Sequence, residues 1–209
     1  LSEGAVAAGA ELRVLVEIEA GMGRCGVTPG ADAVALAQVV DGLPGLRFTG
    51  IMGSVPGPKG DDDPSAHEAK SRANLQVILD NKAATEQAGL SVSVVSVGGT
   101  HCYAQAIQMP GVTEVRAGRY PLMDHRLKPF LPALAPAARI LASVISHPID
   151  GRAVLDAGER DPCETICFDA KVRPGSCPIL NAPDLVLLDS GPQGVVDRMA
   201  AFEECDGGL

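Results

Sequence analysis

Apolar runs alternate with glycine-rich turns along the first part of this chain. The four runs lie at residues 14–18, 46–53, 92–97 and 113–117, and each ends in a turn that contains glycine. Short runs rich in valine and isoleucine and bounded by glycine are typical of strands covered on both faces. We therefore predict four strands in this part of the chain.

Helical patterns fill the spaces between these strands. Residues 31–41 carry apolar side chains three apart, and Ser65-Ala-His-Glu68 has the spacing of a capping box that opens a long helix to about Ala88. Its expected buried stripe comprises Leu75, Ile78, Leu79 and the stem of Lys82; a shorter helix is expected at residues 101–108. Alternating strands and helices predict parallel strands, whose carboxyl ends carry the sites of α/β proteins.

The pattern changes after Pro136. Further strands are expected at residues 139–146, 152–156, 184–188 and 195–202, with a hairpin turn at residues 148–151 and an irregular segment at 161–178. The predicted fold is a partial TIM-type (β/α) barrel of about four parallel strands in residues 1–136. The start of an antiparallel β-domain follows in residues 137–209, and no closed eight-stranded barrel is expected.

Composition excludes some classes of function. A net charge of −9 provides no basic stripe for nucleic acid, and no apolar run is long enough to span a membrane. The six cysteines are scattered, and no signal peptide is visible, so free thiols and a cytoplasmic protein are expected. Because the chain begins with Leu1 rather than Met, it reads as one that starts within a fold.

Cys163, Cys167 and Cys177 form a weak zinc signal. Their spacing is unusual, and no histidine lies close to them in the sequence. Ordinary thiols in a loop are the expected state, and no metal ligand is assigned.

Two glycine turns are the best candidates for ligand binding. Gly98-Gly99-Thr100 and Gly118-Arg119-Tyr120 follow the last two predicted parallel strands. Exposed backbone N–H groups, the start of a helix and the Thr100 hydroxyl would suit a phosphate dianion. The alternative is that both are plain connections.

A third glycine turn follows the first predicted strand and carries Arg24. Glu17 and Glu19 alternate there with Val16 and Ile18, so the carboxylates should lie on the opposite face from the aliphatic side chains. The alternative is a tight connection with a solvated arginine.

Four collinear motifs resemble one family of enzymes. They are Val16-Glu-Ile-Glu-Ala-Gly-Met-Gly-Arg-Cys-Gly-Val27, Val95-Ser-Val-Gly-Gly-Thr100, Glu114-Val-Arg-Ala-Gly-Arg-Tyr120 with Met123-Asp124, and Val154-Leu-Asp-Ala-Gly158. They are similar to the D-threonine aldolase and D-serine dehydratase group of pyridoxal-phosphate enzymes (fold type III), whose catalytic domain is an alanine-racemase-type barrel. The end of the chain, Glu203-Glu-Cys-Asp-Gly-Gly-Leu209, is similar to a Glu-Glu-His-Gly segment of such enzymes.

The resemblance implies a set of cofactor-binding residues. Arg24 would lie beside the cofactor ring, and its phosphate would be held by Gly98, Gly99, Thr100, Gly118, Arg119 and Tyr120. The chain departs from the family at three places. Ser54-Val-Pro-Gly57 replaces a common Tyr-x-Gly-His, His101 stands where glycine is usual, and Arg119 stands where serine is common. Arg119 could strengthen phosphate binding or point into solvent.

The resemblance also identifies what this chain does not contain. The family's Schiff-base lysine lies on a strand upstream of the Arg24 turn, and the pair that binds a divalent metal in intact relatives would follow Leu209. Of the five lysines, only Lys59 lies in a loop at the carboxyl ends of the strands, next to three aspartates that favour its protonated form. No catalytic residue is therefore assigned.

The expected function is that of a pyridoxal-phosphate-dependent lyase of the D-threonine aldolase type. It would act on small D-hydroxy amino acids, with a homodimer as a possible assembly. The alternatives are a non-catalytic phosphate- or cofactor-binding remnant and a fragment without independent function. We expect weak cofactor binding without turnover. We also expect association through the open sheet edges and an exposed apolar inner face.

Overall fold

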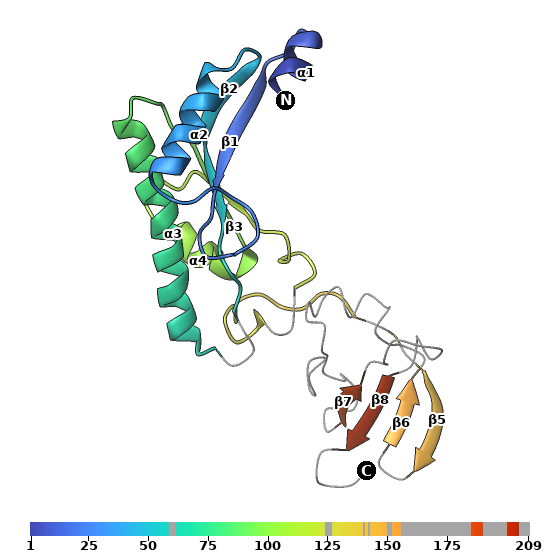
Figure 1. Cartoon of the computed structure of the whole chain (residues 1–209). Coiled ribbons are helices and arrows are strands. Elements are labelled where there is room, and N and C mark those ends of the chain that lie inside the picture. The colour runs from blue at the N-terminus through green and yellow to red at the C-terminus, as the bar shows by residue number, and fades with distance from the viewer. Residues whose placement is uncertain are drawn as a thin grey trace. The chain divides into compact units, whose positions relative to one another are not determined.

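The computed structural model describes residues 1–58, 62–123, 127–139, 141, 143–149, 152–155, 185–189 and 200–204. The chain divides into two compact units, Leu1–Arg119 and Tyr120–Leu209 (Figure 1). The division into domains at residues 136 and 137 stays a prediction.

A parallel sheet forms the centre of the first unit. Its strands run in the order β1-β2-β3-β4, with the bounds Leu12–Ile18 (β1), Leu46–Ser54 (β2), Val94–Gly98 (β3) and Glu114–Arg116 (β4). All three pairings are parallel, which confirms the predicted partial α/β barrel. The helices are α1 (Ser2–Ala7), α2 (Ala31–Gly42), α3 (Pro64–Gln87) and α4 (Tyr103–Ala106), and a 3-10 turn, η1 (Thr100–Cys102), precedes α4.

The hydrophobic core lies between this sheet and its helices. In Figure 1, α2 and α3 run along the same side of β1, β2 and β3. Alternate strand residues point toward them, among them Val16, Ile18, Ile51, Val95 and Val97, each at most 3% exposed. These side chains meet Leu75 and Ile78 of α3, which are fully buried. Burial of this face holds the strands in register.

The N-cap of helix α3 lies earlier in the sequence than predicted. Asp63, not Ser65, is its N-cap: the Asp63 carboxylate accepts the backbone N–H groups of Ser65 and Ala66, each at 3.0 Å. Asp63 thereby fixes the start of the helix that follows the loop after β2, and Pro64 takes the first helical position, where no N–H is needed. The Ser65 hydroxyl also hydrogen-bonds the Asp63 carboxylate.

The buried stripe of α3 is partly polar. Leu75 and Ile78 were predicted correctly, but Leu79 and Lys82 are only half-buried. The stripe instead continues in both directions through His67, Ser71, Asn81 and Thr85. Hydrophobicity could not reveal these positions. None of the helices in the described part of the chain has the length and hydrophobicity that a membrane span requires.

The opposite face of the sheet is mixed in polarity. By alternation with the core residues, it carries the polar residues Glu17, Ser54, Ser96 and Arg116 together with the apolar residues Leu15, Met52 and Val94. Ser96 is nevertheless fully buried, and its hydroxyl accepts a hydrogen bond from the Arg116 side chain. The inner face of the sheet thus contains apolar residues, as expected, and polar residues among them. Association and dye binding by the isolated chain stay predictions.

The second unit contains an antiparallel sheet of four described strands in the order β5-β6-β8-β7. Their bounds are Val144–Ile149 (β5), Arg152–Leu155 (β6), Leu185–Asp189 (β7) and Ala200–Glu204 (β8). The predicted strands are confirmed in kind but not in their limits. β5 begins at Val144 instead of residue 139 because Val144 pairs with Leu155, the last residue of β6. β5 also continues through Pro148 to Ile149, beyond the predicted start of the turn.

Candidate anion-binding site

The parallel strands end at a common edge. Ile18 is level with Gly53, Ser54 with Gly98, and Gly98 with Arg116. The loops that follow the four strands therefore leave the sheet side by side. This is the edge at which parallel α/β sheets place their ligands.

The loops after β3 and β4 are joined directly. The backbone N–H of Arg119 donates to the Thr100 hydroxyl oxygen at 2.9 Å, and that of Gly99 donates to the Arg116 carbonyl at 3.3 Å. Thr100 is 2% exposed, so this junction is buried. A Cβ on Gly118 would meet no atom within 4 Å, which leaves space beside the loop after β4. The two glycine turns singled out in the sequence thus lie together.

The Cys102 side chain hydrogen-bonds the backbone of the glycine turn after β3. The Cys102 thiol donates to the carbonyl oxygens of Gly98 and Gly99, each at 3.3 Å from Sγ. Burial raises the pKa of this thiol to about 11, so it stays protonated and can donate. The Gly98-Gly99 turn is therefore held by hydrogen bonds from an uncharged thiol.

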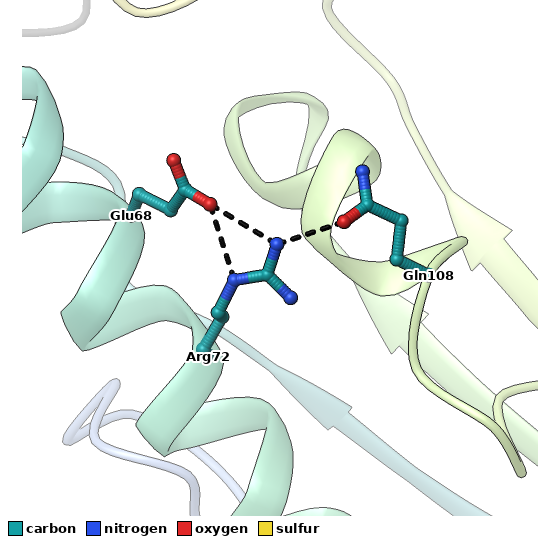
Figure 2. A network of polar contacts seen from close by, with 3 residues as sticks. All are labelled: Glu68, Arg72 and Gln108. Carbon is teal, nitrogen blue, oxygen red and sulfur yellow. Dashed lines mark hydrogen bonds and ion pairs between the residues drawn. The ribbon is translucent and has the colours of Figure 1, made fainter.

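A polar network holds α4 against α3 (Figure 2). Arg72 donates from Nε and Nη2 to one carboxylate oxygen of Glu68, at 3.1 and 3.0 Å. The same Nη2 donates to Oε1 of Gln108, just beyond α4, at 2.8 Å. Since α4 follows the Gly98–Thr100 turn, this network helps to fix the position of that turn.

Two buried histidines, His67 and His101, contact each other near the carboxyl edge of the sheet. His101 is 8% exposed, and its Nε2 lies 3.0 Å from the carbonyl oxygen of Val55, in the loop after β2. His67 of α3 is 5% exposed, its ring centroid is 5.5 Å from that of His101, and its Nε2 is 3.3 Å from the Ser71 hydroxyl. The His67 ring also hydrogen-bonds the backbone carbonyl of His101. These contacts connect the loop after β2, the η1 turn after β3 and helix α3.

Both histidines are neutral at pH 7. Burial, together with the unfavourable electrostatic interaction that a protonated His101 would have with His67 and Arg119, lowers the pKa of His101 to about 4 against the opposing effect of the Val55 carbonyl. Burial also lowers the pKa of His67. The His101 ring lies so close to Gly99 that a Cβ there would be 2.4 Å from it. The absence of a side chain at position 99 thus leaves room for the His101 ring.

Arg116 is a site residue that the sequence reasoning did not select. Its Nε donates to the Ser96 hydroxyl at 3.0 Å, and its Nη2 donates to the Gly53 carbonyl at 2.9 Å. A Cβ on Gly98 would lie 3.2 Å from the same guanidinium, so Gly98 leaves room for it. The available signal was an arginine within a strand, alternating with the core residue Val115.

The remaining candidates are placed differently. Arg24 is exposed at the tip of the loop after β1, while Tyr120 begins the second compact unit and is 56% exposed. Lys59 and the cysteines at 163, 167 and 177 lie outside the described residues. Lys70 and Lys82 lie on the outer helix α3. Among the described residues, no group of three His, Cys, Asp or Glu side chains could hold a metal ion.

These residues fit the phosphate group that the sequence resemblance implies. Gly99 has a φ of 125°, a conformation that side chains rarely adopt, and the edge also carries the cations Arg116 and Arg119. His101 and Cys102 add no negative charge at pH 7, because one is neutral imidazole and the other a thiol.

Comparisons with known proteins identify relatives of this chain. The chain is 33% identical to D-threonine aldolase of an Arthrobacter species over 166 residues, which make up 76% of this chain and 43% of that enzyme. It is 34% identical over 158 residues to D-threo-3-hydroxyaspartate dehydratase of Delftia sp. strain HT23, covering 72% and 40% of the two chains.

Solved structures show the same relationship. The crystal structure of D-threonine aldolase from Filomicrobium marinum matches 98% of this chain and 53% of its own, with a TM-score of 0.78 and 28% identity. The chain thus spans about half the length of the relatives it matches. Residues 1–124 also match the model of the alanine racemase N-terminal domain. The chain therefore belongs to the alanine racemase N-terminal domain family, within which it is similar to the D-threonine aldolases and hydroxyaspartate dehydratases.

Proposed function

We propose that this chain contributes the cofactor-phosphate site of a pyridoxal-phosphate-dependent lyase that acts on D-hydroxy amino acids. The observation that carries the proposal is the Thr100–Arg119 hydrogen bond, which joins two glycine turns at the carboxyl edge of the sheet. Family membership supports the choice of cofactor, and the names of the relatives support the substrate class.

Each loop would have a separate task. The backbone of Gly98, Gly99, Thr100 and Gly118 would surround the phosphate, and the Arg119 side chain would offer a charge-assisted donor. Arg24 would face the ring from the loop after β1, and Tyr120 stays a candidate from the sequence. When bound, pyridoxal phosphate supplies the electron sink that stabilises negative charge on the substrate's Cα.

The chain by itself is expected to bind the cofactor weakly and to catalyse nothing. Proton transfer at Cα needs a basic group within hydrogen-bond reach of the substrate. Lys70 and Lys82 lie on the outer helix, and Lys82 is paired with Glu86 at 2.6 Å. These positions favour the non-catalytic reading for the isolated chain.

Replacing Thr100 with valine tests the proposed phosphate site. The change keeps the shape of the side chain but removes the acceptor for the Arg119 N–H, so we expect the affinity for inorganic phosphate and pyridoxal phosphate to fall about fivefold. Calorimetric titration measures both affinities.

Thr113→Val is the matched control. Thr113 accepts the Val95 N–H at 2.8 Å, at the opposite end of the strands, so its loss should leave both affinities unchanged. Equal losses in the two variants would contradict the proposed site.

Borohydride reduction with pyridoxal phosphate tests the expected lack of turnover. Mapping the modified lysines by mass spectrometry should give sparse labelling spread over several lysines, because among the described lysines Lys70 and Lys128 are exposed and Lys82 is paired with Glu86. D-threonine should not be cleaved to glycine and acetaldehyde. Stoichiometric labelling of Lys59 alone together with such cleavage would overturn this expectation.

A further inference from the structure

The loop after β1 closes tightly on its own strand. The Glu19 N–H donates to the Val27 carbonyl at 3.0 Å, and the Val27 N–H donates to the Glu17 carbonyl at 2.8 Å. Gly26 has a φ of 107°, and a Cβ there would lie 2.6 Å from the Glu19 nitrogen. Only glycine fits this close approach. The segment 19–27 is therefore a closed loop with Arg24 at its exposed tip.

The carboxylate of Glu19 fills the centre of this loop. It accepts the backbone N–H groups of Gly21 at 2.6 Å, Gly23 at 2.9 Å and Arg24 at 3.3 Å. Positive φ angles of 97° at Gly21 and 63° at Gly23 turn successive N–H groups to the same side. Such an arrangement of amides binds anions, and here the anion belongs to the protein itself.

The occupied amides change what the loop can offer a ligand. These hydrogen bonds, that from Gly23 above all, lower the pKa of Glu19. The carboxylate is therefore ionised at neutral pH and remains an acceptor. Since Glu19 takes up the backbone donors, the loop presents the Arg24 side chain rather than a phosphate cradle.

Helix α3 supports the loop from behind. A Cβ on Gly21 would lie 3.3 Å from the amide atoms of Asn74, so the Asn74 side chain packs directly against this turn. The N–H of Gly30, beyond the loop, donates to Oδ1 of Asn81 at 2.7 Å. The loop is thus fixed to β1, to α3 and to its own carboxylate.

We infer that Glu19 is a positioning residue, which acts by hydrogen-bonding the backbone around Arg24 and so holding that arginine at the carboxyl edge of the sheet. The inference rests on the proposed function, since it assigns Arg24 to the ring of bound pyridoxal phosphate. Glu19 itself touches no ligand. Its contribution is to remove the conformational freedom that Arg24 would otherwise lose on binding.

A double-mutant cycle tests this inference. Glu19→Gln, Arg24→Gln and the double variant are titrated with pyridoxal phosphate and with inorganic phosphate. If Glu19 acts through Arg24, each single change lowers the pyridoxal phosphate affinity about fivefold, and the double variant loses no more than either. The affinity for inorganic phosphate stays constant, because the ring contact is absent.

Amide hydrogen exchange of the ligand-free protein gives an independent measurement. Exchange at Gly21, Gly23 and Arg24 should accelerate at least about threefold in Glu19→Gln, because an amide side chain has only one acceptor oxygen. Glu19→Asp, which keeps the charge on a shorter stem, should lie between wild type and Glu19→Gln in exchange and affinity. Asp63→Asn is the control, since Asp63 also accepts backbone N–H groups but caps α3.

The outcomes separate the inference from the proposed function. Wild-type affinity in Glu19→Gln, or additive losses in the double variant, would overturn the positioning role while cofactor binding itself stood. A wild-type chain that binds neither pyridoxal phosphate nor phosphate would refute the proposed function, and the role of Glu19 with it.

Discussion

Replacing Gly50 with alanine is expected to destabilise the chain by more than about 4 kcal/mol, enough to leave much of it unfolded. Gly50 lies in β2 at the register shift between β1 and β2, and it pairs with Val94 of β3. A Cβ at this position would lie 1.9 Å from the Val94 carbonyl oxygen and 2.8 Å from its carbon. The clash is with backbone, so no side-chain rotation relieves it.

Gly42→Ala is the matched control for this change. Gly42 is the last residue of α2, and a Cβ there would meet nothing within 4 Å. Alanine should be neutral or slightly stabilising at this helical position. Urea unfolding followed by circular dichroism measures both variants. A Gly50→Ala protein within 1 kcal/mol of wild type, as an order-of-magnitude bound, would show that β2 and β3 do not pair as described.

Acid is expected to destabilise the chain through its buried histidines. The pKa of His101 is lowered to about 4 from an ordinary value of 6.5, so folding favours its neutral form. The contribution of neutral His101 is complete above pH 6.5 and is lost as the pH falls from 6.5 toward 4. The loss amounts to about 3 kcal/mol for this residue.

Burial sets the direction of this effect, and the surrounding groups add to it. His101 faces His67 and Arg119, and both disfavour its protonated form. His67 in turn faces Lys70, which disfavours its protonation, and Asp62, which favours it. His101→Gln keeps an N–H donor for the Val55 carbonyl but cannot titrate. Its unfolding free energy should fall less than that of wild type between pH 6.5 and 4, by about 3 kcal/mol. Parallel pH profiles of the two proteins would contradict this assignment.

The parallel strands could be predicted because their signal is local. Val16 and Ile18 alternate with glutamates, and Ile51, Val95 and Val97 lie in apolar runs bounded by glycine. The same reasoning placed the glycine turns at one edge, and the Thr100–Arg119 hydrogen bond lies there. The spacing of apolar residues and the positions of the glycine turns were therefore enough to predict the parallel sheet and which loops meet at its edge.

Contacts between polar side chains on separate elements could not be predicted in this way. Nothing in the sequence indicates that Glu19 folds back onto its own loop, or that His67 and His101 share a buried site. The Glu19 contacts depend on the glycine conformations of its own loop, and the histidine contact depends on the angle at which α3 crosses the sheet; periodicity specifies neither. The capping error has a local cause, because Asp63 and Ser65 are both good N-cap residues and the choice depends on where the preceding loop ends.

Amide chemical shifts of the nitrogen-15-labelled chain provide the most direct test of the proposed phosphate site. The chain is titrated with pyridoxal phosphate and, in parallel, with pyridoxal, which lacks the phosphate. The phosphorylated compound should shift the amides of Gly99, Thr100, Gly118 and Arg119 together, while pyridoxal should leave them unchanged. Equal shifts with both compounds, or shifts confined to other parts of the chain, would contradict the assignment of these two turns as the phosphate site.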